Sequence, residues 1–226
     1  IDAAKIAAFG LASWQDLKAA KPTDEVYREL RLLSRQYLQL TSMLVKAKIS
    51  LNNLLDNVMP GITDLLYGRE QNHKLTDFVL RYLHFDKISA MGERRFTTDY
   101  CKWAKKQGYI LYERQAKEIF ALVQNGIPAL PMTASTTIVV KEAIKVVREL
   151  ENSRASILAQ MQTFAKSLPE YSLIREMACV GDTLTPLVIA EIGDVQNFHS
   201  KHALIAYAGI DAPPYQSGGF YGTERH

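Results

Sequence analysis

The fold of this chain is decided by one long apolar repeat, residues 25–58, which read EVYRELRLLSRQYLQLTSMLVKAKISLNNLLDNV. Apolar side chains recur in alternating steps of four and three, at Val26, Leu30, Leu33, Tyr37, Leu40, Leu44, Ala47, Leu51, Leu54 and Val58. This spacing is typical of the seam of a left-handed coiled coil. Thr23 or Asp24 is a suitable helix cap, and Pro60-Gly61 is a stop signal. The stretch predicts a helix about 50 Å long that needs a partner along its length.

A candidate partner follows later in the chain. The same alternation runs through Val140, Ile144, Val147, Glu151, Arg154, Leu158, Met161, Ala165 and Leu168. Glu151 and Arg154 are charged, and Leu150 and Ile157 offer a shifted apolar stripe at that point. Two long helices separated by about eighty residues predict an antiparallel coiled-coil stalk with a small domain at its tip. Pairing between two chains is an equal alternative.

The rest of the chain also has helical periodicity. Amphipathic stretches at 73–85, 94–107 and 112–125 predict a helical insert between the stalk helices, and shorter ones follow at 173–177, 185–192 and 200–208. No strand signal is strong. We therefore expect an all-α fold, with a long antiparallel coiled-coil stalk, a helical insert and a C-terminal domain of helix-hairpin-helix type.

Composition sets wide limits. With 226 residues, 47% hydrophobic and 23% charged, the chain has an ordinary globular composition, and its net charge of +3 permits nucleic-acid binding without requiring it. Cys101 and Cys179 give neither a disulfide framework nor a metal-ligand spacing, so a reducing cytoplasm is the expected setting. No apolar run approaches the ~20 residues that span a bilayer, and no membrane partner is expected.

Two glycine-containing turns are candidate phosphate sites. The turn at 179–182 joins two short predicted helices, and such a turn can direct backbone N–H groups of residues such as Gly181 at a phosphate. Cys179 stands where a helix-hairpin-helix turn has its first glycine, and an ordinary helix-helix turn is the alternative. In the second turn Ser217 precedes Gly218-Gly219, so its hydroxyl is a candidate nucleophile on a backbone that a ligand can approach closely. A solvent-exposed turn serine is the alternative there.

A basic patch lies on the predicted helix at 94–107. It consists of Arg94, Arg95, Lys102, Lys105 and Lys106, interleaved with Phe96, Tyr100 and Trp103. The cations are candidates for neutralising phosphates and the aromatic rings for stacking on bases. The alternative is an aromatic core beneath solvated lysines. His199 and His202 have no third ligand nearby in the sequence, and we interpret them as surface residues rather than a metal site.

With these residues identified, the chain resembles the insertion-sequence transposases of the 110/116/902 type, which include the Piv-like invertases. Residues 1–3, 6–7 and 9–11 resemble the end of that family's RuvC-like domain, which has an Asp-Glu-Asp-Asp site. Residues 27–30 and 34–37 resemble the head of its coiled-coil helix. The C-terminal resemblance to its transposase domain consists of residues 190–194, Phe198, 206–209 and 215–218.

The resemblance implies a DNA recombinase of a mobile element in a bacterial or archaeal cytoplasm. It implies that Ser217 attacks a DNA phosphate, and that Asp2 is the last of four carboxylates that bind a divalent metal, expected to be Mg²⁺. It further implies DNA as the substrate, self-association through the coiled coil and, as in some members, a structured guide RNA as a candidate partner. The expected domains are a RuvC-like tail at 1–20, a stalk at 21–170 with its insert at about 61–135, and a C-terminal transposase domain at 171–226.

The chain departs from this pattern in two places. The other three acidic residues would precede Ile1, so we expect this fragment alone to lack turnover. Cys179 replaces the first glycine of the hairpin turn. Two further hypotheses are a non-catalytic nucleic-acid-binding module and a purely structural coiled coil.

Overall fold

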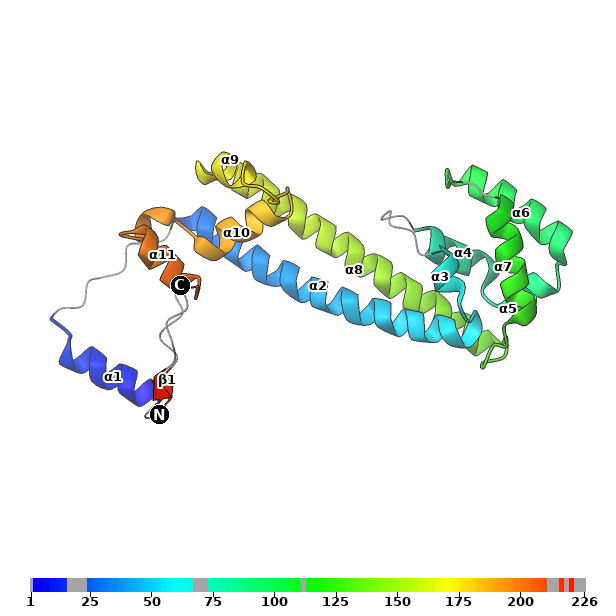
Figure 1. Ribbon diagram of the computed structural model, residues 1–226, viewed down its shortest axis with the longest axis horizontal. Helices are drawn as coiled ribbons and strands as arrows, with labels where there is room; N and C mark the ends of the chain where they lie inside the picture. The colour runs from blue at the N-terminus through cyan, green and yellow to red at the C-terminus, as the bar shows by residue number, and fades with distance from the viewer. Residues whose placement is uncertain are drawn as a thin grey trace. The chain divides into compact units, whose positions relative to one another are not determined.

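The computed structural model describes residues 2–15, 24–66, 73–110 and 113–210, and the backbone of 216–217 and 220–221. These residues are almost entirely helical (Figure 1), which confirms the all-α prediction. The helices are α1 (Asp2–Ala12), α2 (Glu25–Val58), α3 (Ile62–Leu66), α4 (Lys74–Tyr82), α5 (Phe85–Ser89), α6 (Glu93–Lys106), α7 (Glu113–Asn125), α8 (Ala134–Lys166), α9 (Glu170–Arg175), α10 (Leu184–Ile192), the 3₁₀ turn η1 (Val195–Asn197) and α11 (Lys201–Tyr207). The described strands, β1 (Gln216–Ser217) and β2 (Phe220–Tyr221), form one short antiparallel pair, where no strand is predicted from the sequence.

The chain divides into two compact units. Unit 1 contains residues 1–34 and 160–226, and unit 2 contains residues 35–159. Both long helices, α2 and α8, pass from one unit into the other.

The first long helix forms where the apolar repeat predicts it. The backbone N–H of Val26 donates to Asp24 Oδ1 at 3.3 Å, so Asp24 caps α2. The helix ends at Val58, and Gly61 then takes a left-handed backbone conformation with φ of +79°. Proline and glycine at 60–61 therefore act as the stop that the sequence indicates.

In unit 2 the two long helices contribute to one hydrophobic core. Six side chains of the predicted repeats are nearly or fully buried in it, together with Leu55: Leu44, Leu51 and Val58 from α2, and Val140, Ile144 and Val147 from α8. The charged seam position Glu151 is explained by its partner, because Lys48 Nζ lies 2.7 Å from its carboxylate. Near the end of α2 the buried side chain is Leu55, whereas Leu54 is only half-buried. The strict alternation thus drifts by one position there, as a helix of 3.6 residues per turn does.

The insert helices α3 to α7 gather around an aromatic cluster in unit 2. Phe78 is fully buried, with ring centroids of Tyr82, Phe96, Tyr100 and Trp103 between 4.7 and 6.4 Å away. Rings at these separations, several of them edge-to-face, add to the stabilisation that area burial gives. The periodic aromatic positions of the sequence are therefore core positions.

One predicted helix of the insert is interrupted. The periodicity of 73–85 predicts a single helix, but α4 ends at Tyr82 because Leu83 takes φ of +64°. The buried His84 then starts α5, since its Nδ1 accepts from the N–H of Asp86 at 3.1 Å. Its Nε2 lies 2.8 Å from the Leu130 carbonyl oxygen, so the turn is also fixed to the segment before α8.

Polar contacts join segments of unit 1 that are far apart in sequence. The Tyr27 hydroxyl donates to Glu170 Oε1 at 2.8 Å. The Arg31 guanidinium donates to the carbonyl oxygens of Ala190 and Glu191, both at 3.3 Å. These bonds join the start of α2 to α9 and to the end of α10.

Three buried phenols and one half-buried phenol make stability sensitive to alkaline pH. Burial raises the pKa of Tyr27, Tyr82, Tyr100 and Tyr109 above the ordinary value of 10.0, and acceptors such as Asp99 at Tyr82 raise it further. Below pH 10 these phenols are neutral in both states, and above it only the unfolded chain ionises them readily. We expect the free energy of unfolding to fall as the pH rises above 10. Tyrosinate absorbance should then rise together with the loss of far-ultraviolet helical signal. Ionisation of all four with the helices intact would contradict this.

Candidate functional site

The candidate nucleophile lies in the short strand pair. Gln216 pairs with Tyr221 and Ser217 with Phe220, in antiparallel register. The two residues between the paired positions, Gly218 and Gly219, lie outside the described residues, and only the backbone of Ser217 is described. A Gly-Gly pair between two aromatic-containing segments is itself a hairpin signal, so the strands could have been predicted.

The candidate metal ligand Asp2 is the first residue of α1. Its side chain lies outside the described part of the chain, so its relation to Ser217 is not described. Among the residues that the structure describes, no group of three or more His, Cys, Asp or Glu side chains could hold a metal ion. The described residues thus do not make up a metal site by themselves. His199 and His202 are exposed, in agreement with a surface role.

The turn between α9 and α10 is built by a side chain outside the predicted set. Arg175 Nε donates to Asp182 Oδ1 at 2.7 Å, and its Nη1 donates to the Val180 carbonyl oxygen at 3.1 Å. From α8, Gln162 donates to the Asp182 carbonyl oxygen at 3.1 Å. An arginine seven positions before an aspartate gives no pattern that a sequence reading could detect.

Gly181 accepts hydrogen bonds but does not need to be glycine for the fold. Its carbonyl oxygen accepts from the backbone N–H groups of Leu184 and Thr185 and from the Thr185 hydroxyl, at 3.0 to 3.1 Å. A Cβ at Gly181 would meet no atom within 4 Å, and its φ lies outside the left-handed region. A glycine there is required only if another molecule approaches the backbone.

Cys179 has the conformation that glycine favours. It is exposed, and its φ of +67° lies in the left-handed region, where a Cβ is strained. We expect Cys179→Gly to raise the free energy of unfolding by about 1 kcal/mol, because it removes that strain and loses no buried contact. Chemical denaturation monitored by circular dichroism measures the change. Gly181→Ala is the control, and no loss of stability is expected from it. A less stable Cys179→Gly variant would contradict the assignment of strain.

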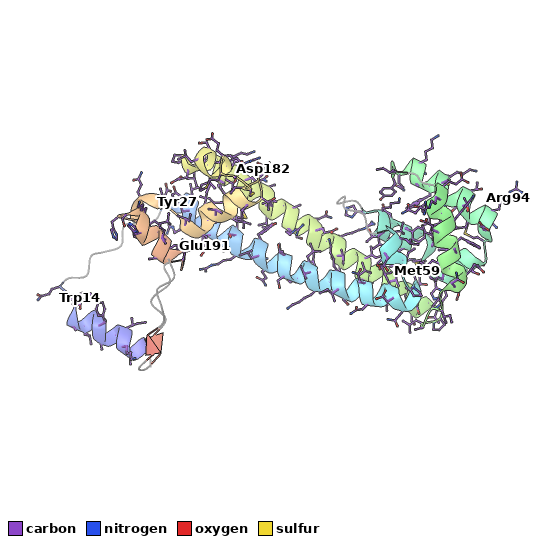
Figure 2. All side chains as sticks on the ribbon, in the orientation of Figure 1. Trp14, Tyr27, Met59, Arg94, Asp182 and Glu191 are labelled. Atoms are coloured by element: carbon purple, nitrogen blue, oxygen red, sulfur yellow. The ribbon has the colours of Figure 1, made fainter. Side chains whose placement is uncertain are left out.

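The basic patch forms one exposed face of α6. Arg94, Arg95, Lys102, Lys105 and Lys106 are all exposed, on the side opposite the buried Phe96, Tyr100, Trp103 and Ala104. The labelled Arg94 points away from the neighbouring helices (Figure 2). The aromatic residues of the patch are core residues, so they cannot stack on bases. The five cations remain available as a surface.

An open groove adjoins the first half of this face. Its volume is about 650 Å³, and Arg94, Arg95, Thr98 and Lys102 contribute to its lining. Glu93 and Asp99 are the carboxylates in it.

The Asp99 carboxylate is bound by donors within the fold. Arg81 binds it with two hydrogen bonds, of 2.6 and 3.1 Å, and the Tyr82 hydroxyl donates to it at 2.7 Å. Burial alone would raise the pKa of Asp99, but these donors hold the pKa below its ordinary value. Asp99 is therefore a carboxylate anchored to α4, and it leaves the five cations of α6 largely uncompensated.

The predicted site residues are divided between the two units. Gly181, Ser217 and Asp2 belong to unit 1, and the five cations of α6 belong to unit 2. The structure brings the five cations together on one helix face. Every helix among the described residues is too short or too polar to cross a bilayer.

Comparison with known proteins gives consistent matches at both ends of the chain. Residues 171–226 match a family model described as "Transposase IS116/IS110/IS902 family", and residues 1–60 match one described as "Transposase", of the DEDD, IS110 type. Transposase domains of the DEDD type generally use divalent metal ions. No solved structure matches the chain.

A relative from Streptomyces coelicolor, described as "Insertion element IS110 uncharacterized 43.6 kDa protein", is 23% identical over 218 residues. The aligned region covers 96% of this chain and 53% of that protein, so the chain spans about half of its length. Two transposase matches in the family's order, with one relative aligned along nearly the whole chain, assign this chain to the IS110/IS116/IS902 family of transposases.

Proposed function

We propose that the full-length protein is a DNA transposase of an insertion sequence that cleaves and rejoins strands through Ser217. One observation carries the proposal: the match to the family's transposase model, residues 171–226, includes Ser217. The local backbone supports it, because Ser217 is the last paired residue before Gly218-Gly219 in a hairpin of minimal length. Glycine beside the nucleophile lets a DNA backbone approach it closely.

The chemistry is a transesterification. The Ser217 oxygen attacks a backbone phosphorus, and one P–O bond to a sugar oxygen breaks as the serine ester forms. The hydroxyl proton leaves to a base, and the released sugar oxygen takes up a proton. Attack on the ester by a sugar hydroxyl of another strand reverses these steps and joins the new strand. The ester retains the phosphodiester energy, so rejoining needs no ATP.

We include a divalent metal ion, Mg²⁺, in the proposal, with Asp2 as one of its carboxylate ligands in the full-length protein. A metal ion bound beside the phosphate would offset charge that develops on it. The support is the match of residues 1–60 to the DEDD-type transposase model. No step above depends on the ion, because the described residues do not form its site.

For the 226 residues alone we propose nucleic-acid contact and self-association without turnover. Exposed apolar side chains on the long helices support self-association: Leu38, Val45, Ile49, Val139 and Val146. The shared core of α2 and α8 in unit 2 favours antiparallel pairing within one chain as the basis of the stalk. DNA is the proposed substrate, a guide RNA is the second candidate partner, and the turn at 179–182 is a candidate phosphate contact of helix-hairpin-helix type.

The test is a search for a covalent protein–DNA adduct. The full-length protein is incubated with DNA carrying the ends of its own element, denatured and separated by gel electrophoresis, and the adduct is digested for mass spectrometry. We expect a nucleotide on the peptide that contains Ser217. An adduct on a different residue, or strand exchange without any adduct, would overturn the assignment.

The second candidate function is a non-catalytic nucleic-acid-binding module. The five exposed cations of α6 favour it, since they could bind a nucleic acid without any catalytic step at Ser217. Binding of element DNA without adduct or strand exchange by the complete protein would favour this alternative.

A further inference from the structure

Basic charge is concentrated in unit 2 rather than spread over the chain. Residues 35–159 contain 18 of the 27 Lys and Arg residues but 12 of the 24 Asp and Glu residues. The remaining residues have an excess of acidic groups. Such an asymmetry between units indicates that unit 2 has a polyanionic partner.

Within unit 2 the excess charge gathers on α6. Its five cations form no ion pair among the described residues, whereas Lys117 and Lys145, on α7 and α8, each have a glutamate one turn away. Of the two carboxylates on α6, Asp99 is bound by Arg81 and Tyr82, and Glu93 remains as one exposed acidic side chain beside the five cations. The face is thus a stripe of like charges that repel one another until an anion neutralises them.

The geometry of the stripe decides which nucleic acid fits. From Arg94 to Lys106 it extends about 18 Å along the helix, which is the length of several successive backbone phosphates. Single-strand binding sites combine cations with exposed aromatic rings on which bases stack. The exposed fraction is 0% for Phe96 and Tyr100 and 6% for Trp103, so α6 has no stacking surface. A duplex presents only phosphates and groove edges and needs no stacking.

We propose that the exposed face of α6, with the groove at its N-terminal half, binds the phosphate backbone of a nucleic-acid duplex without reading its sequence. This inference deepens the proposed function and rests on it for the source of the duplex, which is then DNA. The groove supplies Arg94, Arg95 and Lys102 around a volume of about 650 Å³, enough for a phosphodiester segment. Lys105 and Lys106 extend the contact toward the end of the helix.

The test measures how affinity depends on salt. The full-length protein and its K102Q/K105Q/K106Q variant are titrated with random-sequence duplex DNA over a series of NaCl concentrations. Three lost phosphate contacts should reduce the slope of log K against log salt by about 2.7, and affinity at 0.1 M salt should fall about 100-fold. The matched control K117Q/K141Q/K145Q removes the same charge from exposed positions elsewhere in unit 2, and its slope should stay within about 1 of the parent's.

All six substitutions are at exposed positions, so both variants should keep the parent's helical signal and melting temperature. Equal losses of DNA affinity in the two variants would overturn the proposal, and so would an unchanged slope of log K against log salt in the K102Q/K105Q/K106Q variant. Equal or tighter binding of single-stranded DNA would also overturn it. If duplex RNA binds more than tenfold more tightly than duplex DNA, the α6 face is still a duplex-binding surface, but its ligand is RNA and the assignment to DNA is wrong. Ser217→Ala should leave the salt slope unchanged, so failure of the nucleophile and failure of this surface give different results.

Discussion

If Ser217 is the nucleophile as proposed, replacing it with alanine in the full-length protein should abolish strand exchange and the covalent adduct while DNA binding persists. The substitution removes only the oxygen proposed to attack phosphorus, so the rate of strand exchange should fall by on the order of 10⁴-fold or more. The measurement is recombination between two plasmids that carry the element ends, together with the adduct gel. Binding affinity for the same DNA should change less than about threefold, because the contacts to phosphate do not depend on the hydroxyl.

The control for this variant is Ser172→Ala. Ser172 is exposed on α9, in the same matched region of 171–226, and it should behave as the parent protein does. An adduct that still forms with the Ser217→Ala variant would mean that another residue is the nucleophile. Loss of DNA binding together with exchange would instead indicate that the hairpin has a structural role.

Replacing Phe78 with alanine should be the most destabilising single change in unit 2. The side chain is fully buried among four aromatic rings, the nearest with its centroid 4.7 Å away. Its removal leaves a cavity that rigid rings fill poorly, so the loss should be about 3–5 kcal/mol. Urea unfolding followed by fluorescence measures the loss, because Trp103 packs against Phe78 and reports on the same core.

The matched control for Phe78→Ala is Phe9→Ala. Phe9 is 66% exposed on α1, so the same substitution should change the free energy of unfolding by less than about 0.5 kcal/mol. A loss below about 1 kcal/mol for Phe78→Ala would mean that the aromatic cluster is not the core of unit 2.

The parts of the fold that could be predicted are those set by local periodicity. The apolar repeat predicts α2 with its cap at Asp24 and its stop at Gly61, and the basic and aromatic periodicities of α6 predict its two faces. These features depend on residues three and four positions apart, which a sequence shows directly.

The features that could not be predicted depend on distant partners. Leu83 ends α4 in a left-handed conformation that its side chain disfavours, and the buried His84 fixes the turn through the carbonyl of Leu130. Arg31 finds its acceptors about 160 residues later in the chain, at Ala190 and Glu191. The chemical role proposed for Ser217 comes from family resemblance, because a Ser-Gly-Gly sequence alone is common in turns.

The bonds that Tyr27 and Arg31 make have a consequence for how the gene can vary. They join the start of α2 to α9 and to the end of α10, across a segment that forms a compact unit of its own. The donors and acceptors of these three bonds all belong to unit 1, so an insertion or deletion confined to the segment between Val58 and Ala134 would remove none of them. We therefore expect the length of the segment between the two long helices to be freer to change than the length of the segments that make these bonds.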